Sequence, residues 1–182
     1  MTDPAVHAGT DGRGRDTTAG IEGFFAVMWF LWGRSAAPTW LDVPLAIGAV
    51  AGVLVVIAGI VLAVRSREQF TLMDDPAVRQ RFHLIVGAEF GLLGIGAVIL
   101  GALGLADWIP IWICAGVGLH FLPLARIFVD RYLAPLGILI LAVAAAALVV
   151  GLTTTVSPST VTGPATGACL LLAGIITLRR RR

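Results

Sequence analysis

Two ionisable side chains, Glu89 and His120, lie deep inside apolar stretches of the sequence. Glu89 follows Phe82 and His120 precedes Arg126 by similar intervals, so at helical rise both are expected about 10 Å from the same membrane boundary. An ionised carboxylate at the centre of a membrane helix costs roughly 2.5 to 3.5 kcal/mol on insertion scales. Such a group therefore faces protein, finds a partner or takes up a proton, and a contact between Glu89 and His120 would satisfy both side chains.

This pair has two chemical interpretations. Histidine titrates near neutrality, and burial raises the pKa of a carboxyl group toward that range, which favours a proton-exchanging site open to the cytoplasm. The alternative is a structural interhelical hydrogen bond, typically worth about 0.6 kcal/mol. Glu22 is a further candidate for the polar core, expected nearer the interface, and with His83 it could reach the same layer. Arg126 is expected to act as a cytoplasmic anchor.

Long apolar segments must position these groups. The chain has 182 residues, of which 58% are hydrophobic and 13% are charged, and its mean hydropathy is +0.93. The charges gather in short patches between apolar runs of about 18 to 24 residues, which is the length that crosses a hydrocarbon core as α-helix. The alternating strands of about ten residues typical of a membrane β-barrel are not seen. The sequence therefore predicts an all-α, polytopic membrane protein in contact with a lipid bilayer.

Six spans are predicted, at residues 17–34, 43–64, 76–105, 108–125, 132–152 and 161–178. Asp75 followed by Pro76 is typical of a helix start, whereas Pro123 is expected to kink or end its helix. Gly87 and Gly91 flank Glu89 at GxxxG spacing, which predicts a close helix approach there. The short run 21–33 has an alternative interpretation as a cleaved signal peptide, against which stand Glu22 in its core and Arg34 and Pro38 around the cleavage region.

The arginines predict the orientation of the bundle. All thirteen basic residues are arginine, and six spans place twelve of them on the side of both termini, leaving Arg34 alone outside. By the positive-inside rule both termini are cytoplasmic, and the five tryptophans then fall at the outer interface. The net charge of +2 thus reflects membrane topology rather than binding to nucleic acid. The composition, rich in Arg, Ala, Gly and Val, is typical of a bacterial chain, which predicts the inner (plasma) membrane.

One domain is predicted. Residues 1–19 are expected to be a disordered cytoplasmic tail, residues 20–178 the transmembrane domain, and residues 179–182 a basic anchor. Cys114 and Cys169 are expected to behave as small buried hydrophobic residues, and no metal or cofactor motif is visible.

The segment GLHFLPLAR, from Gly118 to Arg126, resembles a recurring feature of small, uncharacterised multi-pass membrane proteins of bacteria. In those proteins a span with an embedded Glu precedes the segment, as the span with Glu89 does here. The resemblance covers about a quarter of the chain. It implies an integral membrane protein with His120 in a shared motif, and it implies no activity.

Three functions remain open from the sequence. The first is a small transporter or channel-like protein, proton-coupled through Glu89 and His120, for which a homodimer is a plausible assembly. The second is a non-transporting membrane interaction subunit or scaffold with a membrane protein partner bound through the 65–81 loop. The third is an intramembrane enzyme acting on lipid, ranked last because no nucleophile or metal set accompanies the pair.

Overall fold

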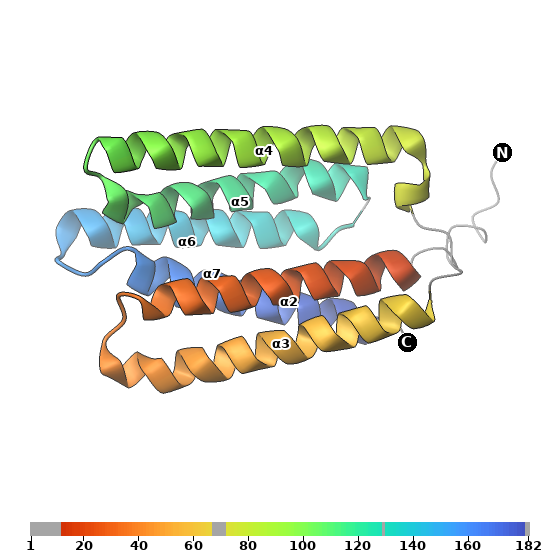
Figure 1. Ribbon diagram of the computed structural model, residues 1–182, viewed down its shortest axis with the longest axis horizontal. Coiled ribbons are helices and arrows are strands. Elements are labelled where there is room, and N and C mark those ends of the chain that lie inside the picture. The colour runs from red at the N-terminus through yellow and green to blue at the C-terminus, as the bar shows by residue number, and fades with distance from the viewer. Residues whose placement is uncertain (1–11, 67–71, 129, 181–182) are drawn as a thin grey trace.

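The computed structural model describes residues 12–66, 72–128 and 130–180. Within these ranges six long helices run up and down in one elongated bundle (Figure 1). They are α2 (Gly12–Arg34), α3 (Asp42–Arg65), α4 (Pro76–Ala102), α5 (Ile109–Ile127), α6 (Leu133–Thr153) and α7 (Ser159–Arg179). Short 3₁₀ turns stand before three of the helices: η1 (Thr39–Leu41), η2 (Leu72–Asp74) and η3 (Ala106–Trp108). The prediction of an all-α fold is confirmed.

The bundle has two chemically different ends. The start of α2 and the end of α7 lie together at one end, with the end of α3, the start of α4, the end of α5 and the start of α6 (Figure 1). We call this the arginine-rich end, because most arginines of the described residues lie there. We call the opposite end the tryptophan-rich end, because it holds Trp29, Trp32, Trp40, Trp108 and Trp112. Which of these ends faces the cytoplasm stays a prediction of the positive-inside rule.

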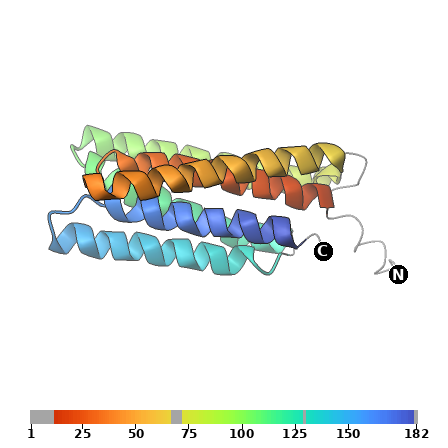
Figure 2. The ribbon, with the colours of Figure 1, turned by 90° about the horizontal axis from the view of Figure 1, so that it is seen from below.

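Five of the six long helices in the described ranges, α3 to α7, are long and apolar enough to cross a membrane. Four of them, α3, α5, α6 and α7, match the predicted spans within two residues at each end. The chain is therefore a multi-pass membrane protein. The exception is α2, which has the length but not the composition, because it carries Asp16, Glu22 and Arg34 among its apolar residues. Its position explains this composition, since α2 packs along both α3 and α7 (Figure 2). The Asp16 and Glu22 side chains are buried there.

Glycines allow α2 to lie very close to its neighbours. Gly52 of α3 faces the backbone oxygen of Gly23, and Gly59 faces the backbone of Gly20, at distances that leave no space for a methyl group. Gly163 of α7 meets Gly33 in the same way. Beside these contacts lies the main apolar core, whose buried members are Ala26, Trp29, Phe30, Leu45, Ala49, Cys114, Leu136, Ile140, Ala144 and Leu170.

Several predicted boundaries are wrong. Residues 12–19 are helical rather than part of a disordered tail, because the Asp16 carboxylate accepts a hydrogen bond from Ser66 Oγ at 3.4 Å and Ala19 is fully buried. Residues 1–11 lie outside the described ranges. Helix α5 continues past Pro123 to Ile127, whereas α4 ends at Ala102, shortly before Gly104 turns the chain with a φ of +73°.

The position of Trp29 differs from the prediction, whereas the start of α4 confirms it. Trp29 is only 3% exposed and stacks on Trp32, so it belongs to the protein core rather than to the membrane interface. The predicted start of α4 is confirmed, since the Asp75 carboxylate accepts the Ala77 N–H at 2.8 Å and Pro76 occupies the first helical position.

Candidate functional site: a carboxylate–imidazole pair in the α4–α5 seam

The two helices that carry Glu89 and His120 meet along one antiparallel seam. Near the arginine-rich end the Phe82 and Phe128 rings lie 5.8 Å apart. Toward the tryptophan-rich end, the side chain of Leu93 fits over Gly116, where a Cβ would collide with it.

Trp112 closes the seam at its far end. Its indole covers Gly96, and its N–H donates to the Leu93 carbonyl oxygen at 3.2 Å. Successive contacts thus pair residues whose numbers sum to nearly the same value, which is the signature of a regular antiparallel register. This register carries Glu89 and His120 to the same level.

The structure brings Glu89 and His120 into contact. Glu89 Oε2 lies 2.6 Å from His120 Nδ1, and each side chain is 13% exposed. Glu89 stands midway along α4, about 20 Å from either end of that helix at 1.5 Å per residue. The imidazole also packs edge-on against Phe121, with ring centroids 6.0 Å apart.

The two groups are in close contact, but their geometry is not that of an aligned hydrogen bond. The Nδ1 atom is buried and has no well-directed hydrogen-bond acceptor among the described residues, although the carboxylate oxygen is within reach. A small rotation of either side chain would align the two groups. The pair therefore has the separation needed for a proton to pass between imidazole and carboxylate, with no large rearrangement.

The glycines around Glu89 do not have the predicted role. Gly87 and Gly91 have nothing within 4 Å of the position that a Cβ would take, so they make no close helix contact in the described residues. Residues two apart on a helix point about 200° away from each other. Glu89 therefore faces α5 while its flanking glycines face outward, on the free side of α4.

Glu22 does not join this pair. Its side chain is 4% exposed and its Oε2 atom accepts a hydrogen bond from the Thr177 hydroxyl of α7 at 3.1 Å. Glu22 lies inside the contact of α2 with α3 and α7, and its expected position near the membrane interface stays a prediction.

The sequence interpretation missed a second polar cluster near Glu22. Arg180 Nη1 lies 3.4 Å from Asp130 Oδ1, and the Arg180 guanidinium stacks on the Tyr132 ring at 3.0 Å from its centroid. The cluster joins the end of α7 to the α5–α6 connection. The sequence interpretation missed this ion pair because a C-terminal run of four arginines is usually interpreted as a membrane anchor.

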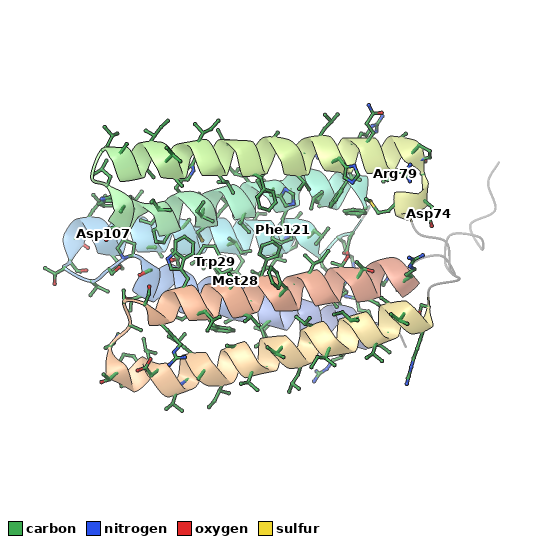
Figure 3. All side chains as sticks on the ribbon, viewed as in Figure 1. Met28, Trp29, Asp74, Arg79, Asp107 and Phe121 are labelled. Atoms are coloured by element: carbon green, nitrogen blue, oxygen red, sulfur yellow. The ribbon has the colours of Figure 1, made fainter. Side chains whose placement is uncertain are left out.

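The remaining predicted residues lie apart from the pair. The His83 side chain is exposed and its ring lies 5.9 Å from Phe82. Arg126 is exposed in the last turn of α5 and makes no ion pair or hydrogen bond with the described residues, so its role as an anchor stays a prediction. Figure 3 shows the side chains of all six long helices as sticks.

Within the described ranges, no group of three or more His, Cys, Asp or Glu side chains could hold a metal ion. Two cavities of those ranges lie elsewhere, one between α2 and α3 and one at the tryptophan-rich end. Comparison with protein-family models, with curated proteins and with solved structures finds no match to this chain. The family resemblance of the GLHFLPLAR segment therefore stays a prediction.

Proposed function

We propose that this multi-pass membrane protein is a small transporter or channel-like protein that exchanges protons through Glu89 and His120. The observation that carries the proposal is the 2.6 Å contact between Glu89 Oε2 and His120 Nδ1, midway along α4. Ionisable groups inside membrane helices are rare and costly, and they mark proton relays and ion pathways.

The sparse packing of α4 supports a movement of this helix relative to α5 at the Glu89–His120 pair. Among the described residues α4 packs almost entirely against α5, and Leu93 is its only buried residue. Elements with few buried apolar contacts open at low free-energy cost. A shift of α4 along the seam would separate the carboxylate from the imidazole and change which of the two holds the proton.

The orientation proposed with this function places the arginine-rich end in the cytoplasm of a bacterial cell, with both termini on that side and α2 as a sixth span. Because α2 buries Asp16 and Glu22, it meets lipid with mostly apolar residues such as Ile21, Phe24 and Met28. Reaction of single cysteines, placed at exposed positions near each end, with an impermeant maleimide in intact cells would test this topology.

Proton uptake into proteoliposomes tests the function. Purified protein would be reconstituted around a trapped pH dye, and proton entry would be driven by a potassium diffusion potential. We expect uptake by the wild type and its loss in both Glu89→Gln and His120→Ala. The matched control is His83→Ala, which removes an exposed histidine of α4 outside the pair. Unchanged uptake in both pair variants would overturn the proposal.

A second candidate function is a membrane interaction subunit, and the free face of α4 favours it. Gly87, Gly91, Gly94 and Gly101 recur along that face, and none has an atom within 4 Å of its Cβ position. Most other described helix glycines contact a neighbouring helix. Small residues let membrane helices approach closely, so this face could receive a helix of a second copy or of a partner protein. Purification as a stable monomer, without a stoichiometric companion, would count against this candidate.

A further inference from the structure

A cavity of about 390 Å³ lies at the tryptophan-rich end, away from the Glu89–His120 pair. Three chain segments line it: the end of α2 with Trp32 and Ser35, the η3–α5 junction with Asp107, and the α6–α7 turn with Ser157 and Ser159. Its size is within the range of about 300 to 1,000 Å³ found for small-molecule sites. Figure 3 shows Asp107 at this end of the bundle, where the turns between the helices gather.

Asp107 gives the cavity its charge. It is the one ionisable residue of the lining, its side chain is exposed, and no hydrogen bond or ion pair joins its carboxylate to the described residues. An acidic residue before a helix often caps it, but neither η3 nor α5 has a side-chain cap, so the Asp107 carboxylate is not used in that way. The nearest basic residue of α2, Arg34, is held by Asp42 of α3 at 3.3 Å.

The helix ends around the cavity do not offer a site for an anion. The first turn of α7 is closed by its own backbone, since Thr160 N donates to the Ser157 carbonyl and Val161 N donates to the Pro158 carbonyl. At the start of α5 the Trp108 N–H donates to the Leu105 carbonyl, and Pro110 has no N–H to give. Because these amide N–H groups already have acceptors, the Asp107 carboxylate determines the charge of the ligand that the cavity prefers.

Two further polar groups of the cavity, the Ser157 and Ser159 hydroxyls, can accept hydrogen bonds from a ligand. The Ser157 and Ser159 hydroxyls lie 2.9 Å apart; when one donates to the other, the pair keeps lone pairs that can accept from a third group and one hydrogen that can donate to it. The Trp32 ring is stacked on Trp29, with centroids 5.3 Å apart and planes 23° apart, so it forms a fixed aromatic wall. Tryptophan faces attract ammonium groups through the negative side of the ring.

We infer that this cavity binds a small organic cation, an amine in its protonated form or a quaternary ammonium ion. Asp107 supplies the counter-charge, Trp32 supplies the aromatic wall, and the Ser157–Ser159 pair accepts hydrogen bonds where the ligand has N–H or O–H groups. The inference concerns a separate site and stands whether or not the Glu89–His120 pair exchanges protons.

Binding of choline, compared with its uncharged carbon analogue 3,3-dimethylbutan-1-ol, tests the inference on the purified full-length protein. The two probes have nearly the same shape and differ in the positive charge, and calorimetry measures both directly. We expect choline to bind at least about tenfold more tightly than the alcohol, a difference of roughly 1.4 kcal/mol. Equal binding of the two probes, or no binding of choline or methylammonium at millimolar concentration, would overturn the inference.

Two variants locate the site. Asp107→Asn is expected to weaken choline binding at least about tenfold, whereas Trp40→Phe, a change at the same end of the bundle but outside the cavity, leaves it within about twofold. Trp32→Phe keeps an aromatic wall and is expected to bind choline more tightly than Trp32→Leu. Melting temperature and elution volume check that each variant is folded. Wild-type binding by a folded Asp107→Asn would refute the assignment of Asp107.

Discussion

Adding one methyl group at Gly59 should destabilise the protein, whereas the same change at Gly91 should not. A Cβ at Gly59 would lie 2.6 Å from Gly20 N and 2.8 Å from both Gly20 Cα and the Asp16 carbonyl oxygen. All three are backbone atoms of α2, so no side chain can rotate away. Favourable carbon contacts need about 3.5 to 4.0 Å, and the two helices would therefore have to separate by about 1 Å.

The expected cost follows from this overlap. Overpacking a well-packed core typically costs about 1 to 3 kcal/mol, and the better helix propensity of alanine offsets up to about 1 kcal/mol of it. We therefore expect Gly59→Ala to lose about 1 to 2 kcal/mol. At Gly91 nothing lies within 4 Å of the Cβ position, so Gly91→Ala keeps only the propensity gain and should be neutral or slightly stabilising.

Thermal unfolding of the two variants in the same detergent, followed by tryptophan fluorescence, measures the difference. The expected order of melting temperature is Gly91→Ala equal to or above wild type, and Gly59→Ala several degrees below it. Equal melting temperatures for all three proteins would refute the packing of α2 on α3. A loss at Gly91 as large as that at Gly59 would show that the free face of α4 is covered in the purified protein, which would favour the interaction subunit.

Three further predictions concern single side chains. Cys114 is fully buried and should resist alkylation in the folded protein, whereas Cys169 is only partly covered, and mass spectrometry after N-ethylmaleimide treatment should show Cys169 modified first. Trp112→Phe removes the indole hydrogen bond to the Leu93 carbonyl and should cost about 0.6 to 2 kcal/mol in denaturant unfolding; no loss would mean that this bond does not hold the seam. Arg34→Gln should change stability by less than about 1 kcal/mol, because its ion pair at 3.3 Å is exposed, and a larger loss would contradict that description.

The spans were predictable because their signal is long and cumulative. An apolar run of about 20 residues between charged patches has few alternatives to a membrane helix, and the hairpin between Glu89 and His120 is short enough to set their relative depth. The start of α4 was also readable, since Asp75 and Pro76 carry a local capping signal. These features depend on neighbouring residues alone.

Other features depend on contacts between distant segments. Nothing in the composition of α2 shows that α3 and α7 cover it, so its early start and the burial of Glu22 were missed. The two GxxxG steps look alike in sequence, yet Gly48 and Gly52 meet α2 while Gly87 and Gly91 meet no other helix among the described residues. Which face of a helix finds a neighbour is decided by the whole bundle, and the local spacing of glycines does not contain that information.

Infrared difference spectroscopy of the Glu89 carboxyl group in membranes tests the central claim most directly. Spectra of wild type, Glu89→Gln and His120→Ala would be compared from about pH 4 to about pH 9, which brackets the ordinary titration of Glu and His. Glu22→Gln serves as the control for the other buried carboxyl group. We expect a carboxyl band that vanishes in Glu89→Gln, titrates within this range and shifts in His120→Ala. A Glu89 band that stays in one state at every pH, and is unchanged in His120→Ala, would contradict proton exchange by the pair.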